Sequence, residues 1–248
     1  MKKATMKAKR SDARYIDTFI THGNTKLKDY YNPDIDTWYR YAQFNIPARI
    51  TCPYATPDCI KFCYAKRDER FPSPRINREK NFAISRTDIF ADRLIYTIAV
   101  EKQSRRYSNA VMIVRIHESG DFYNIKYLRA WLKTFDAFLD NDGIIFQMYT
   151  KSFKFFMDLS DAEKNKLLDL IKAGRVAISL SLDDSMKATQ RADLVRVKAV
   201  LPICNIYYAV KESKLSTVEY NNRCDCADCA RCGHCVKTSG ATVAVAIH

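Results

Sequence analysis

The chain is poor in glycine and proline and has no long apolar run. Its 248 residues include only 6 Gly and 7 Pro, so there is little room for long flexible linkers. No apolar stretch approaches the ~20 residues that span a bilayer, and no G-x-G-x-x-G loop marks a dinucleotide site. The basic N-terminal segment MKKATMKAKRSDARY lacks the apolar region of a secretory signal. We therefore expect a cytoplasmic protein with no membrane partner.

The nine cysteines are distributed unevenly. One stands alone at Cys204, and the others form two groups: Cys52, Cys59 and Cys63, then Cys224, Cys226, Cys229, Cys232 and Cys235. In the cytoplasm thiols stay reduced, which makes disulfides the weaker interpretation. Two tight thiol groups far apart in one chain indicate two metal or iron–sulfur sites.

The charge is strongly positive and uneven. The net charge is +13 and the pI about 9.3. Residues 1–80 carry 17 Lys and Arg against 9 Asp and Glu. Because Lys and Arg contacts to phosphate dominate affinity for nucleic acid, we expect a nucleic acid or nucleotide as partner. A solvated basic surface with no such partner is the alternative.

Strand-like and helical patterns alternate along most of the chain. We expect strands over residues 48–55, 110–117, 143–150, 176–182, 197–203 and 241–248, and helices over 89–106, 127–139, 160–171 and 184–196. The alternation predicts an α/β fold, specifically a partial (β/α)6 TIM-like barrel with a C-terminal cysteine-rich cluster insertion. The expected divisions are a basic arm and lead-in (1–45), the barrel (46–210), the cysteine-rich segment (211–240) and a final strand (241–248).

The first thiol group has the spacing C-x6-C-x3-C. Thiolates from Cys52, Cys59 and Cys63 can hold three irons of a [4Fe–4S] cluster and leave the fourth iron open. Basic residues are expected to lower the pKa values of these thiols: Lys61, Lys66, Arg67 and Arg70. The alternatives are a zinc site with a distant ligand such as His117, and inert buried cysteines.

The second thiol group has the spacing C-x2-C-x2-C-x2-C, from Cys226 through Cys229 and Cys232 to Cys235. This spacing is close to that of ferredoxins and predicts a second [4Fe–4S] cluster, with structural zinc as the alternative. Cys204, at the end of a predicted strand, is the candidate remote ligand.

Polar residues follow several predicted strands, where an α/β barrel places its pocket. The candidate site residues at or beside these ends are His117, Glu118, Ser119, Gly120, Asp121, Tyr149, Lys151, Ser179, Ser181 and Asp183. Their convergence predicts a pocket for a polar small molecule. Taken singly, each is explained as a helix cap or a solvated turn, and His117 as a core histidine.

Several segments resemble the phage protein family called gene product 88. They are Asn24–Leu27, Cys52–Ala65, His117–Asp121 and Tyr149–Ser152, and the tail from Cys229 to His248 also fits. More distantly, the design is similar to radical S-adenosylmethionine (SAM) enzymes, which carry a [4Fe–4S] cluster after the first strand of a partial barrel. Their usual motif is C-x3-C-x-aromatic-C. Phe62 takes the place of the aromatic residue here, although the thiol spacing differs.

The second resemblance implies a function. It implies SAM amino and carboxylate groups near Glu118–Asp121 and the SAM ribose near Ser179, Ser181 or Asp183. It also implies an electron donor such as flavodoxin. Among the residues at the strand ends, His117, Tyr149 and Lys151 are the catalytic candidates. The basic charge and the phage resemblance together favour a nucleic acid or nucleotide as substrate, and the phage resemblance implies the host cytoplasm as the location. The alternative is a non-catalytic nucleic-acid-binding or redox-sensing protein stabilised by zinc or an iron–sulfur cluster.

Overall fold

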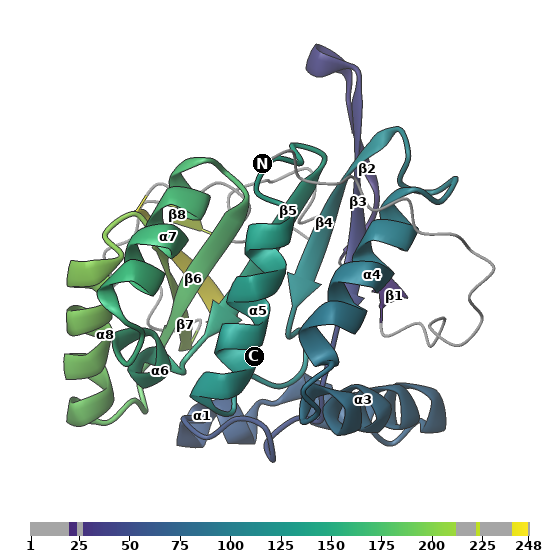
Figure 1. Ribbon diagram of the computed structural model, residues 1–248. Coiled ribbons are helices and arrows are strands. Elements are labelled where there is room, and N and C mark those ends of the chain that lie inside the picture. Colours follow the sequence, from purple (N-terminus) through teal and green to yellow (C-terminus); the bar gives the residue numbers. More distant parts are fainter. Residues whose placement is uncertain (1–19, 24–26, 212–221, 224–239, 248) are drawn as a thin grey trace.

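The computed structural model describes residues 20–23, 27–211, 222–223 and 240–247 (Figure 1). The strands are β1 (Thr21–His22), β2 (Tyr30–Asn32), β3 (Thr37–Phe44), β4 (Ala110–Ile116), β5 (Ile144–Thr150), β6 (Val176–Asp183), β7 (Asn205–Lys211), β8 (Asn222–Arg223) and β9 (Thr242–Ile247). The helices are α1 (Pro57–Lys61), α2 (Tyr64–Asp68), α3 (Pro72–Ser85), α4 (Phe90–Lys102), α5 (Ile125–Ala137), α6 (Phe153–Met157), α7 (Asp161–Lys172) and α8 (Ala188–Val200).

The strands form one mixed sheet dominated by parallel pairing. Its order is β1-β3-β4-β5-β6-β7-β9-β8, and every pair from β3 to β8 is parallel. The short strands β1 and β2 pair antiparallel with β3. From β3 to β7 the parallel neighbours follow one another in the chain, so a crossover connects each to the next, which is the α/β arrangement that the sequence predicts.

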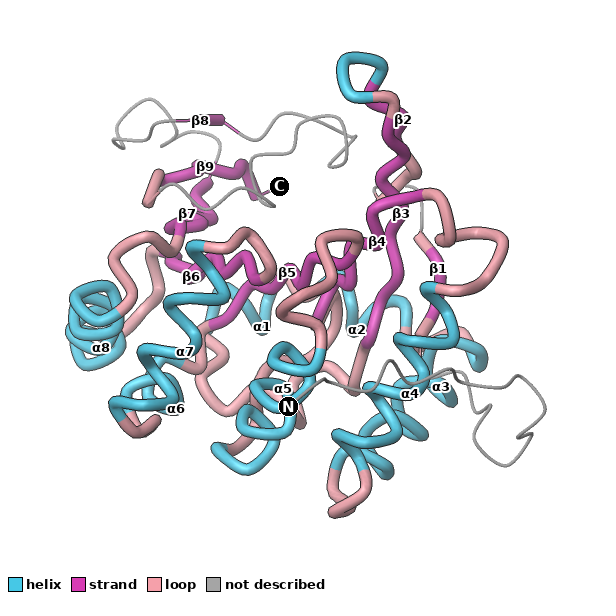
Figure 2. Tube along the Cα trace, turned by 45° about the horizontal axis from the view of Figure 1, so that its top comes forward, coloured by secondary structure: helices cyan, strands magenta, loops and turns pink. Residues whose placement is uncertain are grey.

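The two faces of the sheet differ in chemistry. Figure 2 shows a curved line of strands with α4, α5, α7 and α8 along its outer side. On β4, Met112, Val114 and Ile116 belong to the large apolar core, whereas Arg115 has the opposite parity. On β6, Ser179 likewise lies opposite the core-facing residues and is nevertheless buried. The face without helices is therefore partly polar.

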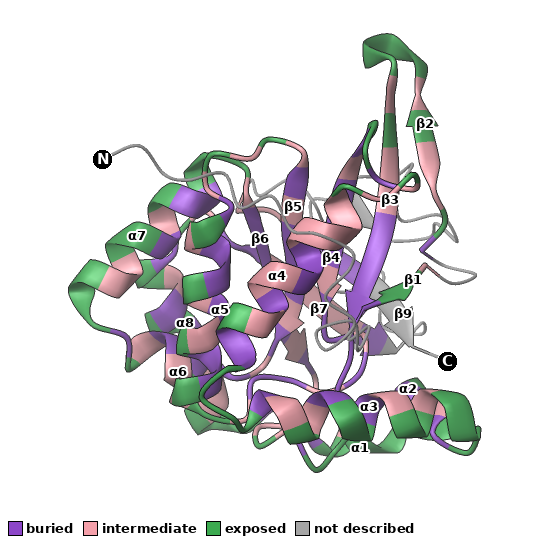
Figure 3. Ribbon diagram, turned by 45° about the vertical axis from the view of Figure 1, so that its right-hand side comes forward, coloured by how far each residue is buried: buried purple, intermediate pink, exposed green. Residues whose placement is uncertain are grey.

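Trp131 of α5 lies at the centre of the core between sheet and helices. It is fully buried and contacts the rings of Phe44 on β3 and Phe90 on α4. Burial of such aromatic groups is the main contribution to holding helices on a sheet. Figure 3 shows the contrast between this buried interior and the exposed tip of the β2–β3 hairpin, where Ile35 is 56% exposed.

The predicted elements between residues 89 and 182 are confirmed closely. The structure has α4, β4, α5, β5, α7 and β6 in the expected places. Ser160 and Glu163 form a capping box at the start of α7, where each side chain accepts a hydrogen bond from the other's backbone N–H. Gly174, with φ of 70°, follows the end of α7, where a left-handed residue is needed. Local signals therefore decide this part of the chain.

Two predicted strands are wrong. Residues 48–55 form a turn-rich loop, because Pro47 and Pro53 interrupt the segment and Arg49 has a left-handed φ of 68°. The first parallel strand is instead β3, within the segment expected to be a lead-in. Residues 197–203 were expected as a strand, but α8 continues to Val200 and buries Val197 against the core. The strand begins later, at Asn205 of β7.

Three helices lie at the lower edge of the sheet in Figure 1, toward which the parallel strands point. They are α1, α2 and α3, all between β3 and α4. The second thiol group and the basic arm 1–15 fall outside the described residues. None of the helices in the described ranges is long and apolar enough to cross a membrane.

Candidate functional site

A cavity of about 360 Å³ opens at the carboxyl ends of the parallel strands. Its walls come from the loop after β3, from the ends of β4, β5, β6 and β7, and from the start of α2. Carboxyl ends of parallel strands are where α/β proteins place ligand sites. Candidate residues far apart in the sequence thus meet at one place.

The three thiols of the first group all line this cavity. Cys52 lies in the loop after β3, Cys59 lies on α1, and Cys63 caps the start of α2. All three are free thiols. Thr56 accepts a hydrogen bond from the backbone N–H of Cys59, which fixes the first turn of α1. The loop that was expected to carry a cluster therefore presents its thiols together.

The pKa values of two of these thiols differ from expectation. Burial, followed by the negative charge of Asp121, raises the pKa of Cys52 to about 12. Burial also raises the pKa of Cys59, while the ammonium of Lys151 lowers it. The sequence predicts that Lys61, Lys66, Arg67 and Arg70 lower the thiol pKa values. These four side chains are exposed. Buried Lys151 takes that role because it faces the thiol inside the cavity.

Distant residues hold the cysteine loop in place. Thr56 Oγ1 donates a 2.5 Å hydrogen bond to Asp183 Oδ2 at the end of β6. The backbone N–H of Asp58 donates to Ser185 Oγ at 2.8 Å, and Gln190 of α8 donates to the carbonyl of Tyr54. These contacts join the loop to residues more than a hundred positions later. The loop is therefore fixed by tertiary contacts rather than by its own secondary structure.

The loop after β4 packs tightly beneath the cysteine loop. Gly120 has φ of 92°, and a Cβ atom there would lie 2.3 Å from Ile46 Cγ1 and 2.7 Å from Thr51 Oγ1. Ser119 Oγ donates to the carbonyl of Ile46, and its N–H donates to Asn45 Oδ1. The close approach explains why glycine occupies position 120. Ser119, expected to bind a cofactor, is thus engaged in holding the two loops together.

Asp121 is the buried acceptor at the centre of the site. Its carboxylate accepts hydrogen bonds from Thr150 Oγ1 at 2.7 Å, the N–H of Lys151 at 2.9 Å and the N–H of Phe122 at 2.7 Å. Burial raises its pKa, and these hydrogen bonds oppose the rise. Asp121 therefore joins the ends of β4 and β5.

Lys151 and Asp183 form an ion pair inside the cavity. Lys151 Nζ lies 3.2 Å from Asp183 Oδ2, and the two side chains are 11% and 2% exposed. Both were predicted as site residues, and both line the cavity together with Glu118 and Ser181. This ion pair lies beside the thiol of Cys59.

Tyr149 forms part of a cluster that the sequence did not indicate. The guanidinium of Arg115 lies 3.8 Å from the centre of the Tyr149 ring, and the Tyr207 ring meets Tyr149 edge-on at 4.6 Å. All three line the cavity. The signal for Arg115 was an arginine inside the otherwise apolar strand AVMIVRI. Tyr207 had no such signal, since β7 was predicted too early.

His117 lies at the inner wall, in an aromatic cluster. Its φ is 63°, and Nε2 pairs with the hydroxyl of Tyr127 at 2.7 Å. Its ring also meets Phe122 at 4.8 Å and Trp131 at 6.4 Å. Burial, followed by the charge of Arg115, lowers its pKa to about 3, so the imidazole is neutral at pH 7. This environment is that of a core histidine which also borders the cavity.

Two predicted site residues lie away from the cavity walls. Ser179 is 2% exposed. It lies opposite Tyr149 in the pairing of β5 with β6, two residues before Ser181 and on the same face of β6. Cys204 belongs to the large apolar core just before β7, at the opposite end of the sheet, and its carbonyl accepts a hydrogen bond from Lys198 Nζ. Its expected partners Cys226, Cys229, Cys232 and Cys235 lie outside the described residues.

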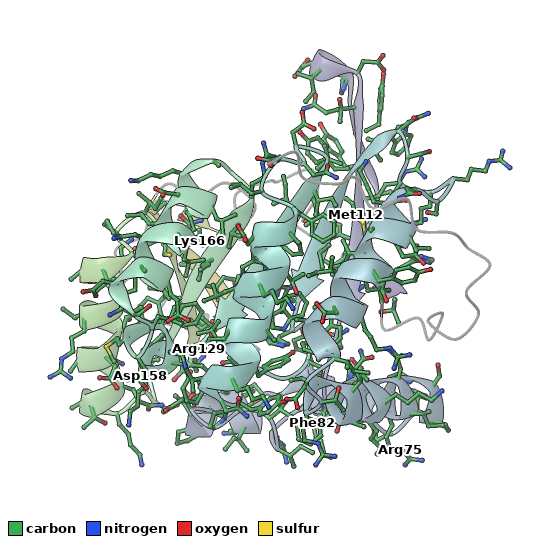
Figure 4. All side chains as sticks on the ribbon, viewed as in Figure 1. Arg75, Phe82, Met112, Arg129, Asp158 and Lys166 are labelled. Atoms are coloured by element: carbon green, nitrogen blue, oxygen red, sulfur yellow. The ribbon has the colours of Figure 1, made fainter. Side chains whose placement is uncertain are left out.

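A second, basic cavity of about 440 Å³ adjoins the first. Phe62 and Cys63 line both cavities. The remaining walls of the second cavity are the exposed cations Arg49, Lys61, Lys66, Arg67 and Arg70. Phe82 of α3, labelled in Figure 4, lies below the strand ends. Its ring meets that of Tyr123 edge-on, with the ring centres 5.2 Å apart. An anionic molecule on this surface would lie directly beside the thiols.

The three thiols are of the donor type that iron–sulfur clusters take, and all three line one cavity. After burial and the charge of Asp121, the nearby thiols of Cys59 and Cys63 also contribute to raising the pKa of Cys52. No three or more His, Cys, Asp or Glu side chains in the described part of the chain gather tightly enough to enclose one ion. The ligands of a cube bind separate irons and therefore need not converge on one point.

The fold and site define an α/β protein with a thiol-lined cavity at the carboxyl edge of a parallel sheet. The chain belongs to the gene product 88 family, whose family model matches residues 18–238. No curated protein and no solved structure matches the chain.

Proposed function

We propose that the chain is an iron–sulfur enzyme of the radical SAM type, with a [4Fe–4S] cluster held by Cys52, Cys59 and Cys63. The observation that carries the proposal is the shared cavity: three thiols from one loop face the polar ends of the parallel strands. Three thiolates satisfy three irons and leave the fourth accessible to a ligand in the cavity. A cluster with three protein ligands and one accessible iron suits catalysis better than a structural role, in which the protein would bind all four irons.

We further propose that the sheet is an open (β/α)6 barrel. Three features support this: parallel neighbours in chain order, helices on the outer side of a curved sheet, and buried polar residues on the opposite face (Figure 2). A barrel interior that is polar at its carboxyl end is the usual setting of an active site.

The roles of the chain's own residues follow from their contacts. Asp183 and Asp121 hold the cysteine loop and the end of β5 in place through hydrogen bonds with Thr56 and Thr150. Lys151 supplies a fixed positive charge beside Cys59, and Phe62 closes one wall of the cavity. When bound, a reduced cluster would supply the one electron needed to cleave a carbon–sulfur bond of SAM. A donor such as flavodoxin would then reduce the cluster again.

Residues for SAM itself come from the cavity walls. We propose that Glu118 and Gly120 face its amino and carboxylate groups and that Ser181 faces its ribose, since all three line the cavity. Ser119, Asp121 and Asp183 act by holding these walls in position.

The C-terminal thiols complete the proposal. Cys226, Cys229, Cys232 and Cys235 are proposed to hold a second [4Fe–4S] cluster or a structural zinc ion. The substrate is proposed to be a nucleic acid or nucleotide, because the net charge is +13 and five cations line the cavity beside Cys63.

The test is SAM cleavage by the anaerobically purified, chemically reduced chain, with methionine release measured by chromatography. The proposal expects methionine from the wild type and none from Cys63→Ala. Cys224→Ala, outside the expected ligand set, serves as the matched thiol-loss control and should retain activity. Equal release from wild type and Cys63→Ala, or none from the wild type with its cluster intact, contradicts the proposal.

A second candidate is a non-catalytic nucleic-acid-binding protein in which the thiols hold zinc or a redox-sensing cluster. The basic cavity favours it, because phosphate binding at Arg67 and Arg70 requires no chemistry at the thiols. The SAM assay, combined with a measurement of nucleic-acid binding at several salt concentrations, separates the two candidates: salt-sensitive binding without SAM cleavage supports the second.

A further inference from the structure

Arg115 is a cation that lines the cavity without an anionic partner among the described residues. It comes from β4 on the face away from the helices, and its Nε and Nη1 atoms are buried with no hydrogen-bond acceptor. No described carboxylate lies within ion-pair distance, and its contact is with the face of the Tyr149 ring at 3.8 Å. The aromatic face partly offsets the buried charge but leaves the N–H groups unsatisfied.

Arg78, the buried arginine of the site region, differs from the half-buried Arg115 in having carboxylate partners. Arg78 of α3 lies 3.5 Å from Glu69 and 3.7 Å from Asp68, and it also donates to the carbonyl of Ala65. Lys151 similarly has Asp183 at 3.2 Å. A buried charge without a partner is costly, whereas a hydrogen-bonded pair compensates for its desolvation. The contrast indicates that the partner of Arg115 is a molecule in the cavity.

We propose that Arg115 binds an anionic group, phosphate or carboxylate, of the molecule that occupies the cavity. The planar guanidinium can donate two parallel hydrogen bonds to such a group through Nε and one of its terminal nitrogens. Tyr149 supports the guanidinium from one face, and Tyr207 fixes the Tyr149 ring from its edge. The inference rests on the proposed function only in treating this cavity as the substrate site; it requires no cluster.

The test measures binding of inorganic pyrophosphate and of succinate to the anaerobically purified chain by calorimetry at constant ionic strength. The wild type is expected to bind one of them, which distinguishes a phosphate from a carboxylate ligand. Arg115→Met should weaken that binding about tenfold or more, and Arg115→Lys, which keeps the charge but loses the paired donors, should fall between. Arg196→Met, which removes the same charge from an exposed position on α8 where Arg196 pairs with Asp193, is the matched control and should bind nearly as the wild type does.

Two results overturn the inference. One is wild-type affinity in both Arg115 variants, or a loss of affinity no greater than in Arg196→Met. The other is no binding of either anion to the wild type at millimolar concentration. Iron content measured on the same samples keeps the proposals separate, since anion binding that depends on Arg115 in an iron-free chain refutes the cluster and leaves this inference standing.

Discussion

The side chain of Thr56 donates a 2.5 Å hydrogen bond to Asp183, across 127 positions of sequence. Thr56 also caps α1, which carries Cys59, and Asp183 ends β6. One contact therefore joins the cysteine loop to the sheet and positions the thiols over the cavity.

Replacement of Thr56 by valine should lower stability and loosen the loop. The change preserves shape but removes a buried donor to a carboxylate and the cap of α1, so the free energy of unfolding should fall by about 1–3 kcal/mol. Urea unfolding at pH 7 measures it. Thr87→Val, which removes a hydroxyl bonded to the carbonyl of Ile84 on an exposed residue, is the control and should cost much less. An equal fall in the free energy of unfolding for the two variants would show that the Thr56–Asp183 hydrogen bond stabilises the fold no more than an exposed one does.

Gly120→Ala should be more damaging than Gly174→Ala. Both residues have positive φ, at 92° and 70°, so both variants incur backbone strain of ~1 kcal/mol. At position 120 the new Cβ would also lie 2.3 Å from Ile46, whereas nothing lies within 4 Å at position 174. We expect an extra cost of roughly 1–3 kcal/mol at position 120 from overpacking, read from denaturant midpoints. Indistinguishable midpoints would contradict the tight packing of the two loops.

His117 should make stability depend on pH below neutrality. Its pKa is about 3 in the folded chain and about 6.5 when unfolded, so the unfolded state binds the extra proton first as pH falls. The stability is fully present above pH 6.5 and should be lost by ~1.4 kcal/mol per unit between pH 6.5 and pH 3. His117→Asn, compatible with the left-handed φ of 63°, removes this titration. The slope of unfolding free energy between pH 6.5 and 5 should be shallower in the variant; parallel slopes would mean that His117 is not a buried neutral group.

Arg67→Ala combined with Arg70→Ala should weaken binding of single-stranded oligonucleotides and reduce its salt dependence. Each lost phosphate contact lowers the slope of log affinity against log salt by ~0.7, so the double variant should lose about 1.4. Lys126→Ala with Lys133→Ala removes the same charge from α5, where both cations pair with exposed carboxylates. Fluorescence anisotropy at several salt concentrations measures both pairs. Equal effects would place the binding surface elsewhere than the basic cavity.

The sequence predicted the middle of the fold well because the signals there are local. Apolar residues with helical period gave α5, β-branched runs gave β4 and β5, and Ser160 with Glu163 gave the start of α7. It failed at β3 and β7. In β3 the pattern TWYRYAQF mixes polar and aromatic residues on both faces, and at the end of α8 the run VKAVLPI is compatible with either period.

The site was predicted in its parts but not in its connections. The polar residues after β4, β5 and β6 were expected to converge, and Glu118, Lys151 and Asp183 do line one cavity. The engagement of Ser119 and Asp121 with backbone groups of other loops was not predictable, because those partners come from separate strands. Arg115 was missed for a similar reason: only the fold shows that no described carboxylate reaches it.

The central claim is that Cys52, Cys59 and Cys63 hold an iron–sulfur cluster, and metal content tests it most directly. Iron, acid-labile sulfide and zinc should be measured per chain after anaerobic purification of the wild type, Cys59→Ala and the control Cys224→Ala. The account predicts about four irons with matching sulfide at this site, lost in Cys59→Ala and kept in Cys224→Ala. Zinc without iron in the wild type, or full iron in Cys59→Ala, would contradict it.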